Sequence, residues 1–449
     1  MRYMHPVLTA SLTGLLFFAV TGCTGPHDDG NHDRSSPFPT SSPSLKLPDL
    51  NEQNIQVAAA WTGEQETKFK EVLQEFEKLT GAKTTYVRTG GNVPAFLDAR
   101  LADHNPPDVA FLSQPEAIRQ LAHSKRIQPA NKAVMEQLNK NYRPVWRNFG
   151  RVDGKQYGVF YKVTNKSMIW YNSKLFDDIG VAEPQNFKQF MTTARTVASA
   201  GTPALSVAGA DGRTLADWFE NIYLSQSGPE KYDQLTMHKI PWTDPSVKSA
   251  LTVLGEIFGG NRLIPKDNQE TDATRSITQI FTKPPKAAMV LGGDLTESVI
   301  TSQTKANAGQ EAKAFPFPAF TKGGASTISG GDAAVAVKGS QGAQALLAFL
   351  ASTNAAEIRA KLGDFISPNG QMAASAYIGD IPYSLAAGVI AAGDNVRFDM
   401  SDQAPPSFIA TQGAGLWKEL QGFVKNPRDI SGTQVRLEAD ATKAYQGSS

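Results

Sequence analysis

The chain after residue 54 alternates short apolar runs with stretches that are apolar at helical spacing. Residues 54–61 form an apolar run that predicts a strand ending at Trp61. The next apolar residues recur three and four positions apart, which predicts a helix that ends at Gly81. The alternation continues as strand, helix, strand and helix over residues 83–89, 93–102, 106–114 and 115–126. This order predicts a parallel sheet covered by helices.

A second pattern of the same kind follows a long β-rich segment. Residues 150–176 contain a hairpin signal at Asp153-Gly154 and no clear helix, which is typical of a segment that passes between domains. Helices are then predicted over residues 187–201, 215–226 and 246–258, and strands over residues 203–209 and 287–293. Residues 332–352 return to strand, turn and helix. Because roughly 400 residues are too many for one core, we expect two α/β lobes between which the chain crosses and returns.

The N-terminal segment predicts export and anchoring. An apolar run from Pro6 to Val20 leads to Cys23, the only cysteine in 449 residues, and the sequence Val20-Thr21-Gly22-Cys23 resembles the lipobox of bacterial lipoproteins. Residues 1–23 are therefore predicted to be a lipoprotein signal peptide, with Cys23 lipidated. The alternative is an ordinary signal peptide with an incidental cysteine.

Residues 24–53 are rich in Ser, Pro and Asp, which predicts a disordered tether. The His and Asp residues within positions 27–33 are expected to be solvated, so no metal site is predicted there. The net charge of +1 provides no field for nucleic acid or anionic lipid. No cofactor is predicted.

Several sequence pieces, in this order, resemble one protein family. They are "PPDVAFLSQPE", "DGKQYGVFYKVTNKSMIWYN" and "GGDAAVAV", together with the lipobox, the tether and the opening strand and helix. The chain resembles the extracellular solute-binding lipoproteins of sugar ABC importers, the group related to maltose-binding protein. "DWFENIYLSQSGPEKYD" and "IPWTDPSVK" are similar to the α-glucoside and oligosaccharide branch. One departure is Phe187, which stands where such proteins often have tryptophan, so no sugar contact is assigned there.

The resemblance implies a two-lobe periplasmic-binding-protein fold, type II-like, with sugar between the lobes. The N-terminal lobe would comprise residues 54–162 and 322–364, and the C-terminal lobe residues 163–321 and 365–449. The protein would be a monomer that captures an α-glucoside or other di- or oligosaccharide and delivers it to ABC importer permease subunits. It would lie outside the cytoplasm, anchored to the bacterial cell membrane by lipidated Cys23, and would not be an enzyme.

Sugars offer hydroxyls that pair with carboxylates and amides, and apolar faces that stack on aromatic rings. In α/β sheets, ligands bind beyond the carboxyl ends of the strands. Trp61, Glu64, Asn92 and Gln114 follow the first three predicted strands and are therefore candidates for binding.

Further candidates lie in the crossing region and the second pattern. Lys162 lies in the crossing region, and Asp294 and Asp332 each follow a glycine pair that lets the backbone approach a ligand. The alternative for these two aspartates is an ordinary glycine turn with a helix-capping residue. Asp217, Trp218 and Glu220 lie on one predicted helix, where Trp218 shares the spacing of a core stripe, so core and site remain equally open for it.

Two other functions stay open. A binding protein for a phosphorylated polyol, such as a glycerol phosphate, would need convergent arginines, for which Arg88 and Arg213 are available. A glycoside hydrolase would use two of the carboxylates, but no catalytic signature singles out a pair.

Overall fold

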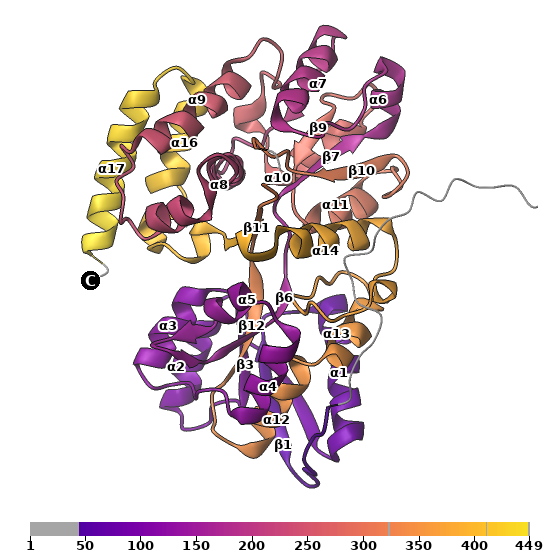
Figure 1. Ribbon diagram of the computed structural model, residues 1–449, viewed down its shortest axis with the longest axis vertical. Coiled ribbons are helices and arrows are strands. Elements are labelled where there is room, and N and C mark those ends of the chain that lie inside the picture. The colour runs from indigo at the N-terminus through magenta and orange to yellow at the C-terminus, as the bar shows by residue number, and fades with distance from the viewer. Residues whose placement is uncertain (1–44, 322–323, 410, 448–449) are drawn as a thin grey trace, which may run out of the picture. The chain divides into compact units, whose positions relative to one another are not determined.

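The computed structural model describes residues 45–321, 324–409 and 411–447, and these form two lobes (Figure 1). The N-terminal lobe contains a five-stranded sheet in the order β2-β1-β3-β12-β6. Its elements are β1 (Asn54–Ala59), α1 (Gly63–Thr80), β2 (Lys83–Arg88), α2 (Val93–Ala102), β3 (Val109–Leu112), α3 (Pro115–His123), α4 (Lys132–Asn141), α5 (Pro144–Phe149), β4 (Arg151–Val152), β5 (Lys155–Gln156), β6 (Gly158–Val163), β12 (Gly331–Ala336), α12 (Gln341–Leu350) and α13 (Thr353–Ala360).

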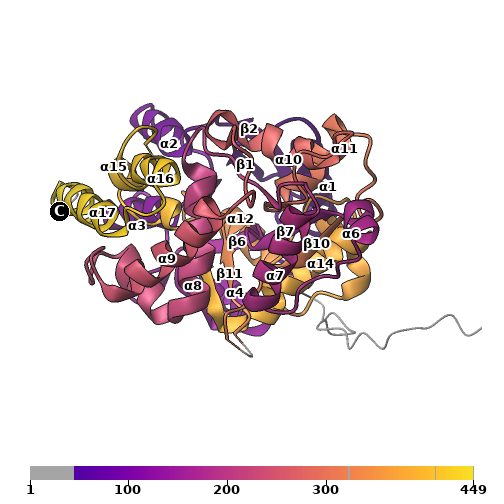
Figure 2. The same cartoon turned by 90° about the horizontal axis from the view of Figure 1, so that it is seen from above.

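The C-terminal lobe contains a four-stranded sheet in the order β10-β7-β9-β8. Seen from above in Figure 2, α9 and α15–α17 lie on one side of this lobe and α6, α10 and α11 on the other. Its elements are β7 (Met168–Asn172), α6 (Ser173–Ile179), α7 (Phe187–Ser199), β8 (Leu205–Ser206), α8 (Arg213–Thr236), α9 (Pro245–Gly259), α10 (Ala273–Thr278), β9 (Met289–Leu291), α11 (Leu295–Gln303), β10 (Ala312–Pro316), β11 (Thr327–Ser329), α14 (Asp380–Ala392), β13 (Val396–Phe398), α15 (Pro406–Ile409), α16 (Gly415–Lys425) and α17 (Ile430–Gln446).

The direction of β12 lies outside the prediction, which concerns the strands of residues 54–114. β1 pairs in parallel with β2 and β3, as predicted, whereas β12 is antiparallel to both β3 and β6. The chain reaches β12 from the C-terminal lobe and so enters the sheet at the edge where the parallel strands end. The first residues of β12 therefore lie beside the carboxyl ends of its neighbours, and Asp332 pairs with Lys162 near the end of β6.

Two local predictions are confirmed by backbone geometry. Gly81 has a φ of 74°, and its N–H donates to the carbonyl oxygen of Glu77 at 2.8 Å, which ends α1 in the left-handed conformation that glycine favours. Asp153 and Gly154 have φ values of 47° and 77°, and they join β4 to β5. Two consecutive left-handed residues make the tight hairpin that the Asp-Gly pair predicts.

The tether prediction is wrong for its last part. Leu50 is 1% exposed, and Leu45 and Leu47 pack against the core of the N-terminal lobe. The backbone N–H of Leu50 donates to Thr80, at the end of α1. These leucines supply the apolar surface that the rest of the predicted tether lacks. The rest of the tether, the signal peptide and Cys23 lie outside the described residues.

The last crossing between the lobes begins later than residue 365. Ile366 forms a β-bridge with Val163, Asn369 forms one with Tyr142, and the N–H of Gly370 donates to Asn141. Residues 365–370 therefore still belong to the N-terminal lobe. No helix in the described part of the chain is long and apolar enough to cross a membrane.

Candidate ligand-binding site

A cavity of about 630 Å³ lies where the two lobes meet. Five of the residues predicted from the sequence line it, and they come from both lobes and from the crossing strand β6. Those five are Trp61, Glu64, Lys162, Asp294 and Asp332. The other polar residues that line it are Thr62, Gln65, Ser113, Thr164, Glu297, Ser298 and Asp364.

Asp332 is held by two neutral donors from the N-terminal lobe. The indole Nε1–H of Trp61 donates to one carboxylate oxygen at 3.0 Å, and the Ser113 hydroxyl donates to the other at 2.8 Å. The Trp61 ring is itself fixed against Phe69 and Phe111, with centroids 5.0 and 4.6 Å away. Each carboxylate oxygen can accept a further hydrogen bond. Asp332 is thus oriented before any ligand arrives.

Asp294 brings a second carboxylate from the C-terminal lobe. It follows β9 through Gly292 and Gly293, and a Cβ on Gly293 would lie 3.1 Å from the carbonyl oxygen of Asn165, so this glycine allows the loop to approach the crossing segment. The side chain of Asp294 makes no capping hydrogen bond to α11, which leaves its carboxylate available. Burial raises the pKa of Asp294, and the nearby Lys162 opposes that shift.

Glu297 lies one helical turn after Asp294 and also lines the cavity. Burial raises the pKa of the Glu297 carboxyl, and the negative charges of Asp364 and Asp294 raise it further. Asp364 and Glu64 each have a cationic partner, because Lys68 forms an ion pair with both, with Nζ–O distances of 2.6 and 2.8 Å. In the described part of the chain, neither Asp294 nor Glu297 forms such an ion pair.

A charged cluster adjoins the cavity at Gly330. Lys166, in the first crossing segment, forms an ion pair with the buried Asp399 that follows β13. Burial raises the pKa of Asp217 to about 6 and that of Asp402 to about 7. A Cβ on Gly330 would lie 3.5 Å from a carboxylate oxygen of Asp402, so the cluster begins two residues from Asp332.

The sequence model of the bacterial extracellular solute-binding proteins matches residues 59–357, which is more than half of the chain. The chain belongs to this family. The match covers the whole cavity wall contributed by β1, β3, β6, β12 and the loop before α11, and it ends within α13.

Two curated relatives span nearly the same length as this solute-binding protein. It is 26% identical to the osmoprotective compounds-binding protein GgtB of Synechocystis over 426 residues, covering 93% of this chain and 94% of GgtB. It is 26% identical to the alpha-glucosides-binding periplasmic protein AglE of Rhizobium meliloti, covering 85% of this chain and 86% of AglE. The solved structure of apo RafE from Streptococcus pneumoniae has the same fold, with a TM-score of 0.73 at 17% identity, over 90% of this chain and all of that one.

The structure does not bring the other predicted residues to this cavity. Asn92 is exposed and caps α2 by accepting a hydrogen bond from the N–H of Ala95, and Gln114 is exposed before α3. Trp218 is 2% exposed and lies in the core of the C-terminal lobe, which favours the core alternative. Glu220 is fully buried in that lobe, where it accepts hydrogen bonds from Tyr232 and the N–H of Met400. Asp217 belongs to the charged cluster described above.

Several cavity residues escaped the sequence analysis, some of them despite an available signal. Ser113 directly follows β3 and obeys the same strand-end rule as Trp61. Glu297 is three residues from Asp294 on one helix and so shares its face. Thr164 and Asp364 had no local signal, because only the crossing segments bring them to the cavity.

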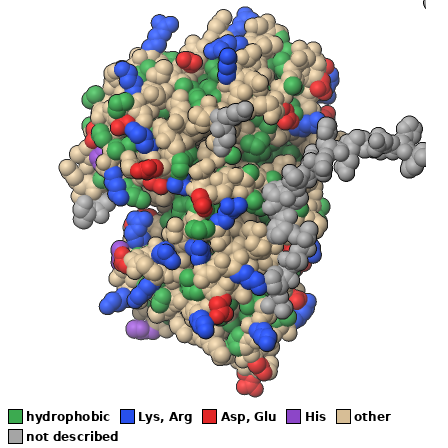
Figure 3. All heavy atoms as spheres, in the orientation of Figure 1, with side chains coloured by type: hydrophobic (Ala, Val, Ile, Leu, Met, Phe, Trp, Pro, Cys, Tyr) green, Lys and Arg blue, Asp and Glu red, His purple; other side chains and the backbone are tan. Residues whose placement is uncertain are grey.

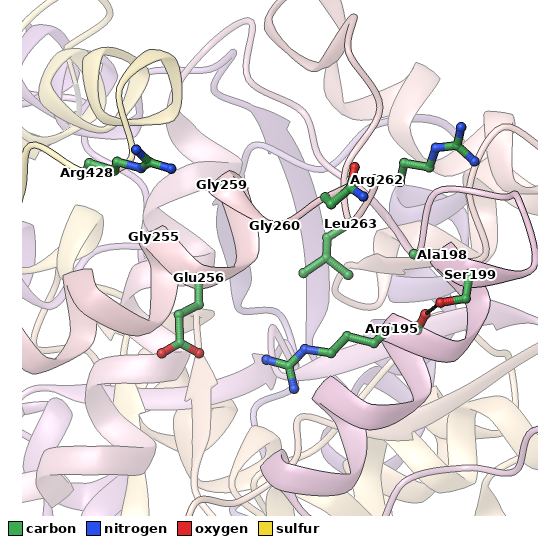
Figure 4. Close-up of a pocket in the computed structure, with 11 residues that line it drawn as sticks. Arg195, Ala198, Ser199, Gly255, Glu256, Gly259, Gly260, Arg262, Leu263 and Arg428 are labelled. Carbon is green, nitrogen blue, oxygen red and sulfur yellow. Dashed lines mark hydrogen bonds between the residues drawn. The ribbon is translucent and has the colours of Figure 1, made fainter.

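Within the described ranges, no group of three or more His, Cys, Asp or Glu side chains is arranged to hold a metal ion. Three arginines line a separate hollow of about 880 Å³ on the C-terminal lobe (Figure 4). Arg195 and Arg428 extend toward this hollow from different elements, and Arg262 lies just beyond the end of α9. Positive side chains near the ends of α7 and α9 complement the negative C-terminal ends of those helices.

The charged cluster predicts a pH dependence of stability. Asp217 and Asp402 keep their protons to a higher pH in the folded protein than their ordinary value of 3.8 allows in the unfolded chain. The folded state therefore binds more protons between about pH 4 and 7, and the free energy of unfolding falls as the pH rises through this window. Asp402→Asn should lessen this fall and unfold at a higher temperature than the unmodified protein above about pH 7. Thermal unfolding at a series of pH values measures both effects.

The matched control is Asp178→Asn, which removes one carboxylate from the exposed surface of α6. Parallel pH profiles for Asp402→Asn and the unmodified protein would contradict the assignment of the shifted pKa to Asp402.

Proposed function

We propose that this protein captures a carbohydrate, an α-glucoside or other di- or oligosaccharide, in the cavity between its lobes and delivers it to an ABC importer. The observation that carries this proposal is the set of preoriented hydrogen-bonding groups around the cavity, above all Asp332 with its donors Trp61 and Ser113. Carboxylates that can accept from hydroxyls, beside an indole ring, are the groups that sugar recognition requires. The name of AglE, an alpha-glucosides-binding protein, supports the ligand class.

The charge of the cavity disfavours the phosphorylated-polyol alternative. Five carboxylates and a single lysine line it, and no arginine does. Of the two arginines considered from the sequence, Arg88 pairs with Glu66 away from the cavity, and Arg213 lies at the start of α8. A phosphate ester would meet like charges, which repel it.

The experiment that tests the proposal is a thermal-shift screen of mono-, di- and trisaccharides, with glycerol phosphates included. A ligand at a hundredfold excess over its dissociation constant should stabilise the folded protein by about 2.7 kcal/mol. We expect one or more neutral or amine-bearing sugars to raise the unfolding temperature and the glycerol phosphates to leave it unchanged. Stabilisation by glycerol phosphates alone would refute the carbohydrate proposal. Sugars recovered intact after incubation would distinguish binding from hydrolysis.

The proposal includes a membrane anchor at Cys23, the only cysteine of the chain. Thioether-linked lipid together with an acyl group on the new N-terminus would supply the two or more chains that stable anchoring requires. Cys23→Ser should release the protein from the membrane or leave an unprocessed precursor, with sugar affinity unchanged, because the cavity lies within residues 60–385. Metabolic labelling with a fatty acid measures this, and label that persists in Cys23→Ser would disprove the anchor.

A further inference from the structure

The cavity is strongly negative although the whole chain carries a net charge of only +1. Both signs of charge occur across the molecular face in Figure 3. Among the described residues that line the cavity are five carboxylates and one cation, Lys162, while Lys68 and Lys166 act on them from behind the wall. The lining groups by themselves, five negative and one positive, carry a net formal charge of −4.

Among the described residues, three of the five carboxylates form no ion pair. Lys68 contacts Glu64 and Asp364, whereas Asp332 accepts only from the neutral Trp61 and Ser113. Among the described residues, no other side chain donates a hydrogen bond or forms an ion pair with Asp294 or Glu297. The three unpaired carboxylates, Asp294, Glu297 and Asp332, come from both lobes.

Lys162 forms no ion pair with these three carboxylates. Its side chain lines the cavity and is only 9% exposed, yet within the described part of the chain it makes no hydrogen bond or ion pair. Water can solvate this ammonium group in the open cavity, and once a ligand excludes that water the group needs an oxygen acceptor. The ligand must therefore supply oxygen acceptors to Lys162 as well as donors to the carboxylates.

We propose that the ligand of this cavity is a glycoside that carries a protonated amine, bound in preference to the neutral sugar of the same shape. Binding excludes water from the cavity, and burying unpaired carboxylates is costly unless a positive charge accompanies them. Sugar hydroxyls supply hydrogen bonds but no charge. An ammonium group among Asp294, Glu297 and Asp332 supplies both, and the remaining hydroxyls accept from Lys162. This inference rests on the proposed function and specifies its substrate class.

The test compares matched pairs of sugars on the full-length protein by isothermal titration calorimetry near neutral pH. One pair is trehalose and trehalosamine, and the other is cellobiose and the β-1,4-linked disaccharide of glucosamine. Because the members of each pair share a linkage, the difference reports the amine alone. We expect the amine to tighten binding by roughly 10-fold or more in at least one pair, as for a hydrogen bond to a charged group. The gain should shrink at high sodium chloride.

The double variant Asp294→Asn/Glu297→Gln removes two of the unpaired charges and should reduce the preference for the amine. Asp178→Asn removes a carboxylate from the exposed surface of α6 and should leave the preference intact. Thermal unfolding of the unliganded variants checks that each is folded.

The outcomes separate this inference from the proposed function. If the neutral sugar binds as tightly as its amine in both pairs, the carbohydrate proposal stands and the amine preference is refuted. If no sugar in the pairs or in the wider thermal-shift screen binds, the carbohydrate proposal and the amine preference are both refuted. If the preference survives unchanged in Asp294→Asn/Glu297→Gln, the amine is recognised elsewhere and the assignment to these carboxylates is refuted.

Discussion

Asp332→Asn is expected to lower ligand affinity by about 10- to 150-fold, the effect of losing a charged acceptor worth about 1.5–3 kcal/mol. We choose this residue because Trp61 and Ser113 hold both of its carboxylate oxygens at the wall of the cavity. Asparagine keeps the shape of the side chain but removes the charge and one acceptor. Calorimetry with the best sugar from the thermal-shift screen measures the loss.

Two further variants show whether the orientation of Asp332 or its charge is responsible for the loss of affinity. Ser113→Ala removes one of the two donors and should lower affinity less than Asp332→Asn, because the charge remains. Asp178→Asn, on the exposed surface of α6, should leave affinity unchanged. Full affinity in Asp332→Asn would show that the ligand does not use this cavity, even if the protein binds sugar.

Trp218→Ala is expected to lower the free energy of unfolding by about 3–5 kcal/mol while leaving ligand affinity nearly unchanged. The indole is 2% exposed, lies in the core of the C-terminal lobe and meets the ring of Phe317 edge-on at a centroid distance of 6.2 Å. Truncation leaves a void that the surrounding side chains fill only in part. Urea or thermal unfolding of the unliganded protein measures the loss.

Trp61→Phe is the matched comparison and should behave in the opposite way. It keeps an aromatic ring against Phe69 and Phe111 but deletes the N–H that orients Asp332. The free energy of ligand binding should weaken by more than the free energy of unfolding. A large loss of affinity in Trp218→Ala, measured on folded protein, would show that Trp218 contributes to ligand binding.

Local patterns predicted the elements of this protein and part of its site. Helical spacing and a glycine in the left-handed conformation located α1 and its end at Gly81, and the Asp153-Gly154 pair located a hairpin. The rule that ligands bind beyond strand ends selected Trp61, and glycine pairs selected Asp294 and Asp332. The helix end and the hairpin are confirmed because each depends on neighbours within a few residues along the chain, and the three site residues line one cavity while their role in binding stays a prediction.

The tertiary structure alone decided which of the candidates meet. Asn92 follows a strand just as Trp61 does, yet it is used as a helix cap, and Glu220 on α8 is fully buried. The antiparallel entry of β12 places Asp332 beside Ser113, 219 positions earlier in the chain. The partner of Lys166 is Asp399, 233 positions away. Such pairings follow from three crossings between lobes, and because the chain between the partners is long, no local periodicity encodes them.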